Sequence, residues 1–313
     1  MRIAVFGTGG AGGYFGARLA QAGEDVTFLA RGAHLRAIRE RGLCVKTPDG
    51  DILIHPARAT DSPDEAGVMD VVLVGVKTWQ IAEAAAAMKP MLGERTLVLP
   101  LQNGVEAAAQ LAVVLGSRHV LGGLCGTLSQ LERPGVIRSI GSVHMIKFGE
   151  LEGSESERTK TLLEVLRRPG VNASIPENIH VALWEKFLFV VPVGGIGAVS
   201  RAPIGTTRSA PETRRLLERA MREIFDVAHA RGIPLADDVI ARTMAFVDTL
   251  APAGTASLQR DIADGKPSEL DAWNGAVVRL GRDAGVPTPL HEFIYHGLLP
   301  LERKARGEVE FAS

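Results

Sequence analysis

The N-terminal stretch Arg2-Ile3-Ala4-Val5-Phe6-Gly7-Thr8-Gly9-Gly10-Ala11-Gly12-Gly13 decides the fold. Its first five residues have the apolar composition of a short buried strand, and a helical pattern follows from Tyr14 to Ala22. The glycines between them form G-x-G-x-x-G. In such a turn the first glycine permits the tight bend, the second lets the backbone approach a pyrophosphate, and the third lets helix and strand pack closely. The predicted phosphate-binding residues are Gly7, Thr8, Gly9, Gly10, Ala11 and Gly12.

The composition is that of an ordinary soluble globular protein. The 313 residues are 46% hydrophobic and 23% charged, and this length is sufficient for two domains. The net charge is −1, so the chain lacks the excess positive charge that binds nucleic acid or an anionic membrane. Cys44 and Cys125 show neither metal-ligand spacing nor a disulfide framework, so we expect no metal and a cytoplasmic location. The apolar run from Phe187 to Val199 has 13 residues, which is short for a bilayer span.

The residue after the second predicted strand, Val26 to Ala30, bears on the choice of cofactor. Proteins that prefer NAD usually place Asp or Glu here, to bind the ribose 2′-hydroxyl. This chain has Arg31, and a guanidinium suits a 2′-phosphate. We therefore predict NADP(H); the alternative is that Arg31 is a solvated loop residue.

Two further strands end in polar residues. The apolar segment from Asp70 to Val76 is followed by Lys77, and the segment from Thr96 to Leu101 is followed by Gln102 and Asn103. Open α/β sheets bind ligands beyond the carboxyl ends of their strands. We therefore expect Gly7, Arg31, Lys77 and Asn103 to lie at one crevice.

The remaining pattern separates two domains. Gly42 to Thr60 predicts a β-hairpin around Pro48-Asp49-Gly50, and strands are predicted at 119–126, 136–149 and 171–175, with a helix at 159–168. After Pro176 the pattern is helical throughout. Helices are predicted over 178–191, from a capping box at Ser209 to Arg231, over 237–250, from a cap at Ser268 to Gly285, and from Pro287-Thr288-Pro289 to Arg306. The fold class is α/β, with a Rossmann dinucleotide-binding domain at 1–175 and an all-α domain at 176–313.

Two charged residues of the helical region are candidates for chemistry. Lys186 lies among Trp184, Phe187 and Leu188; its amine either reaches solvent along its stem or is held at a site where it can donate a proton. Glu269 is either a helix-start carboxylate or a functional one. Ser257 is similarly ambiguous, and no serine lies in a nucleophile elbow, so hydrolysis has no support.

Together these motifs resemble the 2-dehydropantoate 2-reductase, or ketopantoate reductase, family over essentially the whole chain. The resemblance rests on the glycine motif, on Leu29-Ala30-Arg31, Val76-Lys77-Thr78-Trp79-Gln80, Leu101-Gln102-Asn103-Gly104-Val105 and Leu183-Trp184-Glu185-Lys186, on Ser257-Leu258-Gln259 with Asp261, on Glu269 with Asn274-Gly275, and on Gly285-Val286-Pro287-Thr288-Pro289.

The resemblance implies an NADPH-dependent reductase with a cleft between its two domains and a role in pantothenate and coenzyme A biosynthesis. Arg31 and Lys77 would hold the adenosine phosphate end of the cofactor, and Asn103 would contact cofactor or substrate. Lys186 would be the general acid. Glu269 would bind the substrate's hydroxyl, and Ser257 its carboxylate region. The expected partner is a small 2-oxo acid; homodimerisation stays open.

One departure from the family pattern concerns the substrate. Members commonly carry asparagines four and eight residues after the catalytic lysine and another further on, where this chain has Val190, Gly194 and Ile204. Part of the polar substrate shell is therefore missing. The alternatives are a paralogous NADP-dependent reductase of another 2-oxo acid, and a protein that senses NADP(H) without turnover.

Overall fold

The computed structural model describes residues 1–141, 144–153 and 155–311 and divides into two compact units. Unit 1 contains Met1–Gln102 and Glu106–Ile179, and unit 2 contains Asn103–Val105 and His180–Ser313. Each unit has its own apolar core.

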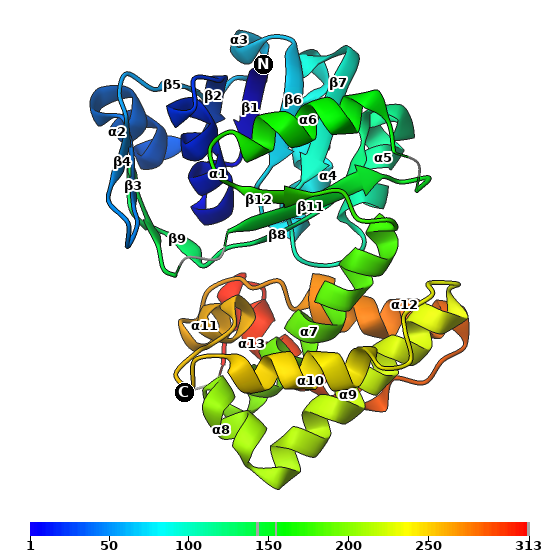
Figure 1. Cartoon of the computed structure of the whole chain (residues 1–313). Coiled ribbons are helices and arrows are strands. Elements are labelled where there is room, and N and C mark those ends of the chain that lie inside the picture. Colours follow the sequence, from blue (N-terminus) through cyan, green and yellow to red (C-terminus); the bar gives the residue numbers. More distant parts are fainter. Residues whose placement is uncertain (142–143, 154, 312–313) are drawn as a thin grey trace. The chain divides into compact units, whose positions relative to one another are not determined.

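A five-stranded parallel sheet forms the centre of unit 1 (Figure 1). Its strand order is β5-β2-β1-β6-β7, with the first strand of the chain in the middle. The strands are β1 (Arg2–Phe6), β2 (Asp25–Leu29), β5 (Arg58–Thr60), β6 (Met69–Val74) and β7 (Leu92–Pro100). Ligand-binding loops of such a sheet follow the carboxyl ends of these strands.

Alternate residues of the central strands bury opposite faces of the sheet. Ile3 and Val5 lie in one core with α1 and α6, while Ala4 and Phe6 lie in another with α4 and α5. Strands buried on both faces need the continuous apolar sequence seen here. The helices of unit 1 are α1 (Gly10–Gln21), α2 (Gly32–Arg41), α3 (Pro63–Ala66), α4 (Ile81–Ala87), α5 (Ala107–Leu115) and α6 (Glu157–Arg167).

Two smaller sheets complete unit 1. One has the order β4-β3-β10-β9 and the other β12-β11-β8. The hairpin predicted over Gly42 to Thr60 is confirmed only as far as the antiparallel pair β3 and β4, because Arg58–Thr60 is β5 of the parallel sheet. The predicted strand over 136–149 is two strands, β10 and β11, in different sheets. Residues 142 and 143 of that prediction lie outside the described residues. The strands are β3 (Leu43–Lys46), β4 (Ile52–Ile54), β8 (Leu121–Gly126), β9 (Ser129–Arg133), β10 (Val136–Ser139), β11 (Met145–Glu150) and β12 (Asn172–Ser174).

Steric contacts of the glycine turn fix the first strand–helix junction. Gly7 has φ +100°, a backbone conformation that residues with a side chain rarely adopt. A Cβ on Gly12 would lie 2.4 Å from the carbonyl oxygen of Gly7, and a Cβ on Gly75 would lie 2.7 Å from the same atom. The carbonyl of Gly7 therefore lies between two other glycines, so α1 can approach β1 and the end of β6 only if positions 12 and 75 carry no side chain.

Unit 2 is helical and is built around α7. The helices are α7 (Ile179–Ser200), α8 (Ile204–Ser209), α9 (Pro211–Ala230), α10 (Val239–Thr249), α11 (Ser257–Ala263), the π-helix η4 (Asp271–Gly275), α12 (Ala276–Ala284) and α13 (Pro289–Ala305). Their buried faces form one core that includes Trp184, Phe187, Met221 and Trp273.

Helix α7 is longer than predicted, because it continues through Pro192 to Ser200. An interior proline costs a helix about 3 kcal/mol, and burial of the surrounding apolar residues in the unit 2 core offsets this cost. Among the described residues, α7 alone is long and apolar enough to cross a membrane. Two thirds of its most apolar stretch is buried inside the structure, as in the core helix of a globular protein.

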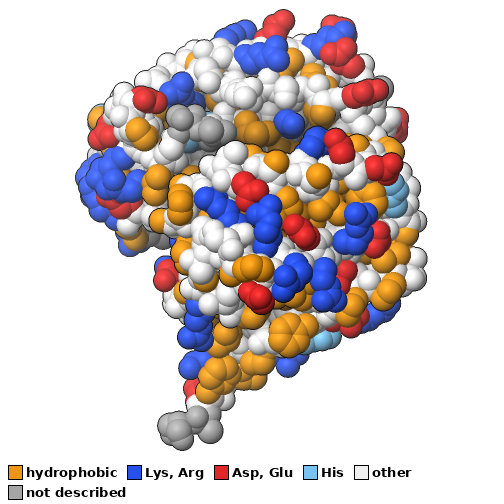
Figure 2. All heavy atoms as spheres, turned by 60° about the horizontal axis from the view of Figure 1, so that its bottom comes forward, with side chains coloured by type: hydrophobic (Ala, Val, Ile, Leu, Met, Phe, Trp, Pro, Cys, Tyr) orange, Lys and Arg blue, Asp and Glu red, His pale blue; other side chains and the backbone are white. Residues whose placement is uncertain are grey.

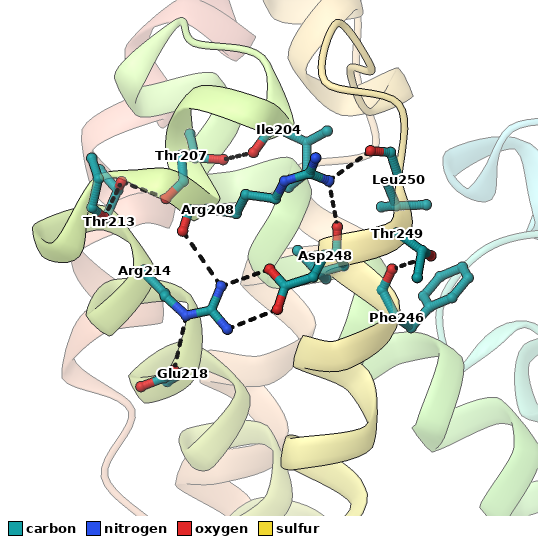
Figure 3. Close-up of polar contacts among 12 residues, drawn as sticks. Ile204, Thr207, Arg208, Thr213, Arg214, Glu218, Phe246, Asp248, Thr249 and Leu250 are labelled. Carbon is teal, nitrogen blue, oxygen red and sulfur yellow. Dashed lines mark hydrogen bonds and ion pairs between the residues drawn. The ribbon is translucent and has the colours of Figure 1, made fainter.

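A network of arginine contacts joins α8, α9 and α10 (Figure 3). Arg214 pairs with both carboxylate oxygens of Asp248 at 2.7 and 2.9 Å, and Arg208 donates to the carbonyls of Val247 and Leu250 at the end of α10. Ser209 was predicted to cap α9, and this is wrong. Ser209 ends α8, and α9 begins after Ala210 with Pro211 in its first turn.

The last two predicted helices are confirmed, but the first of them begins differently than predicted. Gly285 ends α12 in the left-handed conformation, and α13 begins at Pro289. The segment predicted to start at a Ser268 cap instead begins with the π-helix η4, where Gly275 N donates to the Leu270 carbonyl at 3.1 Å. π-Helical turns are rare and occur frequently at functional sites.

The glycine contacts predict a difference between two substitutions. Gly12→Ala should lower the free energy of unfolding by about 1–3 kcal/mol, the usual cost of overpacking, because the new methyl group meets the Gly7 carbonyl. Gly9→Ala should cost less than about 1 kcal/mol, the loss expected at a helix N-cap, because nothing lies within 4 Å of a Cβ there. Urea denaturation measures both, and equal stability losses would contradict this account of the turn.

Candidate functional site

Thr8 shapes the glycine turn through three hydrogen bonds. Its amide and its hydroxyl both donate to the Leu29 carbonyl, at 3.0 and 2.9 Å. Its carbonyl accepts from Nε2 of His34 at 2.7 Å, and Nδ1 of His34 accepts from Gly135 N at 2.9 Å. The imidazole is therefore neutral in this arrangement, and burial lowers the pKa of His34. The hydrogen bonds of Thr8 therefore attach the turn to the end of β2 and to His34.

The start of α1 has the features that a pyrophosphate needs. A Cβ built on Gly9 meets nothing within 4 Å, so this side of the turn is open to an approaching group. Helix α1 has twelve residues, no acidic residue in its first turn and no side-chain cap at Gly9. Its first amide groups and the positive end of its dipole are suited to an anion. These residues fit the phosphates of a dinucleotide.

Arg31 follows β2, as predicted, and is paired with an acid. Its Nη2 lies 3.0 Å from Oε1 of Glu83 on α4, and both side chains are about two-thirds exposed, at 67% and 65%. A pair this exposed is weak. The guanidinium can therefore exchange Glu83 for another anion.

Lys77 and Asn103 follow β6 and β7 but belong to different units. Lys77 lies in unit 1, and its Nζ is 5.8 Å from the centre of the Trp79 ring. Gln102 anchors the end of β7 because its Nε2 donates to the carbonyls of Val74 and Val76, at 3.0 and 2.9 Å. Asn103 lies one residue further on and packs with unit 2. The structure therefore groups Gly7, Arg31 and Lys77 in unit 1, and Asn103 with the helical residues.

Lys186 is half-buried on α7, next to the deeply buried Phe187 and Leu188. Low-polarity surroundings strengthen the field of a charged amine. Its four-carbon stem can pack along apolar neighbours while the ammonium group reaches a polar site.

The other predicted substrate residues also lie in unit 2. Glu269 is only 8% exposed and lies just before η4, and its carbonyl accepts from Trp273 N at 3.0 Å. Ser257 is half-buried and is the first residue of α11.

Packing explains the glycine that replaces an expected asparagine at position 194. A Cβ on Gly194 would lie 2.6 Å from Cζ3 of Trp273 and 3.4 Å from Cδ2 of Leu258. The indole ring therefore occupies the space that a larger residue would need. Val190, half-buried on the same helix, is apolar as well. This part of unit 2 is less polar than the family pattern predicts.

Some residues of these sites were not identified from the sequence. His34 and Glu83 contact Thr8 and Arg31 from 26 and 52 residues away, and no motif connects such positions. Trp273 lies between Glu269 and Asn274, which belong to a quoted motif, yet its packing against Gly194 depends on how two helices meet. Gly75 lies inside the segment from Asp70 to Val76 that was predicted as a strand, and its contact with the Gly7 carbonyl was not identified from the sequence either.

Metal-ligating side chains do not cluster in the part of the chain that the structure describes. Within residues 1–141, 144–153 and 155–311, no group of three or more His, Cys, Asp or Glu side chains could hold a metal ion. Figure 2 shows basic and acidic side chains intermixed on the face that it presents, in keeping with the net charge of −1.

Comparison with known families gives two matches that together cover most of the chain. Residues 3–153 match the family model described as Ketopantoate reductase PanE/ApbA, and residues 178–302 match its C-terminal counterpart. A 2-dehydropantoate 2-reductase from Halobacterium salinarum is 32% identical over 93% of this chain and 95% of its own length.

Solved structures agree. A PanE/ApbA family ketopantoate reductase from Ralstonia eutropha superposes with a TM-score of 0.89 at 31% identity, covering 98% of this chain and 100% of that one. A 2-dehydropantoate 2-reductase from Geobacter metallireducens gives 0.90 at 30% identity, covering 96% and 99%. With a Rossmann unit, a helical unit and both family regions present, this chain belongs to the ketopantoate reductase family of oxidoreductases.

Proposed function

We propose that this protein reduces 2-dehydropantoate to D-pantoate with NADPH, in pantothenate and coenzyme A biosynthesis. The observation that carries the proposal is the match of both regions of the chain to the ketopantoate reductase family, with relatives at about 30% identity over nearly their whole length. A cytoplasmic location accords with this role.

The glycine turn supports the cofactor part of the proposal. The open side of Gly9 and the start of α1, which no side chain caps, suit the pyrophosphate. Arg31 and Lys77 follow β2 and β6, the two strands that flank β1, and supply cations for the 2′-phosphate. When bound, NADPH supplies the hydride; this chain's residues supply orientation and electrostatics.

Lys186 is proposed as the general acid. Reduction of a ketone builds negative charge on its oxygen. An ammonium group at hydrogen-bonding distance stabilises that charge and gives its proton to the oxygen. Phe187 and Leu188, which follow Lys186 in the sequence, are buried. They lower the local dielectric and so strengthen this interaction.

Glu269 is proposed to accept a hydrogen bond from the substrate's hydroxyl, with Ser257 and Asn103 binding other polar groups. One observation favours a second candidate. Trp273 fills the space beside Gly194, and Val190 is apolar, which suits a less polar 2-oxo acid. A paralogous reductase of such an acid is therefore the alternative.

A substrate comparison tests the proposed function. We expect kcat/KM for 2-dehydropantoate to exceed that for 3-methyl-2-oxobutanoate by up to roughly four orders of magnitude, because the analogue lacks the hydroxyl that Glu269 is proposed to bind. NADPH oxidation followed by absorbance measures both rates, with a reaction lacking oxo acid as the blank. Equal rates with the two acids would favour the paralogue, and no turnover with any 2-oxo acid would favour a sensor.

The Arg31–Glu83 pair predicts cofactor preference. Arg31→Ala should raise KM for NADPH at least about tenfold more than KM for NADH, because a charged hydrogen bond to the 2′-phosphate is lost. Glu83→Gln should lower KM for NADPH by roughly 1.5- to 5-fold, the range of an exposed ion pair, because Arg31 no longer has a competing partner.

The matched control is Glu40→Gln. Glu40 is 62% exposed and lies 3.3 Å from Arg41 on α2, so its removal changes the surface charge equally without releasing Arg31. A wild-type enzyme that prefers NADH, or a Glu83→Gln variant that binds NADPH more weakly, would refute the assignment of Arg31.

A further inference from the structure

Three residues of the segment 268–274 are each held by α13. Ser268 contacts Glu302, Asp271 contacts Tyr295, and Asn274 contacts His291. As the residue number rises along the segment it falls along α13, so the two run antiparallel. Glu269 lies inside this segment.

The Ser268 contact is the most elaborate of the three. Ser268 N donates to both carboxylate oxygens of Glu302 at 3.1 and 3.0 Å, and Ser268 Oγ donates to Oε2 at 2.5 Å. Arg306 donates to the same carboxylate at 2.7 Å and to the Ser268 carbonyl at 3.2 Å. Ser268 is fully buried and Glu302 is 4% exposed. Glu302 and Arg306 thus bind the amide, hydroxyl and carbonyl of one residue.

The other two contacts fix the turn after Glu269. The Tyr295 hydroxyl and Nη1 of Arg279 each donate to Oδ1 of Asp271 at 2.9 Å. Asn274 Nδ2 donates to Nδ1 of His291, whose Nε2 donates to the Ala220 carbonyl, both at 3.0 Å. The pKa of His291 is lowered to about 4 by burial, so this imidazole stays neutral and keeps both hydrogen bonds near neutral pH.

The backbone at Glu269 is therefore fixed from both sides. The preceding residue, Ser268, is bound by Glu302, and the carbonyl of Glu269 accepts from Trp273 N. Directing a side chain this firmly matters where it must meet a substrate group, because a displacement of about 1 Å can cost two orders of magnitude in rate.

We propose that Glu302 is a positioning residue, which sets the placement of the Glu269 carboxylate by binding Ser268. The inference rests on the proposed function, in which Glu269 accepts a hydrogen bond from the substrate's hydroxyl. The alternative role for Glu302 is to stabilise unit 2 without affecting substrate choice. The two roles differ in one measurable quantity, the ratio of kcat/KM for 2-dehydropantoate to that for 3-methyl-2-oxobutanoate, called here the hydroxyl preference.

The test is Glu302→Gln in the full-length enzyme. The amide has a single acceptor oxygen in place of the two that Ser268 and Arg306 use. We expect the hydroxyl preference to fall by about 10- to 100-fold, with NADPH binding, measured by fluorescence, unchanged. Ser268→Ala keeps the backbone donor and should give an intermediate loss. It also serves as the second variant if Glu302→Gln fails to fold.

Glu150→Gln is the matched control. Glu150 in unit 1 is 9% exposed and accepts from Ser156 Oγ at 2.5 Å and Arg158 Nε at 2.7 Å, a serine–arginine arrangement like that around Glu302. This variant should lower Tm as Glu302→Gln does and keep the hydroxyl preference.

The outcomes separate this inference from the proposed function. A wild-type enzyme with a hydroxyl preference that Glu302→Gln and Ser268→Ala both retain would overturn the positioning role alone. The same loss of preference in Glu150→Gln would overturn it too, since the effect would then follow stability. A wild-type enzyme without the preference would overturn the substrate assignment and the positioning role together.

Discussion

The close approach of Gly7 and Gly12 is the contact on which unit 1 depends. The Gly7 carbonyl lies where a Cβ at position 12 would collide with it at 2.4 Å, and Gly75 is packed against the same atom. This contact brings the start of α1 against the end of β1, in the middle of the parallel sheet. The consequence is a helix N-terminus placed where a pyrophosphate can meet it, with Arg31 and Lys77 on loops after the neighbouring strands.

The sequence was sufficient to predict features that depend on neighbouring residues. The buried strands, the glycine turn, the first part of the hairpin predicted over 42–60 and the end of α12 at Gly285 follow from local pattern and are confirmed. The Ser209 cap was wrong because the same serine ends a preceding short helix, and the extent of α7 through Pro192 was missed because burial outweighs a local rule.

The missing parts of the candidate sites are long-range contacts. His34 reaches Thr8, and Glu302 reaches Ser268 across 34 residues. Neither His34 nor Glu302 belongs to a sequence motif. Each contacts its partner only once the chain has folded, so the contact could not be predicted from neighbouring residues. The packing of Trp273 against Gly194 likewise explains a departure from the family pattern that sequence alone could only record. Unit 2 thus combines the apolar packing of Trp273 and Gly194 with the segment 268–274, which contains Glu269 and is bound by α13.

The central claim is that Lys186 protonates the oxygen of a 2-oxo acid as hydride arrives, and single-turnover kinetics of Lys186→Ala test it most directly. With NADPH saturating and NADPH binding followed separately by fluorescence, the account predicts that the rate of NADPH oxidation by 2-dehydropantoate falls by about two to three orders of magnitude, the usual loss for one oxyanion donor, while NADPH affinity hardly changes. A variant that oxidises NADPH at nearly the wild-type rate would show that Lys186 is a helix surface residue and would contradict the mechanism.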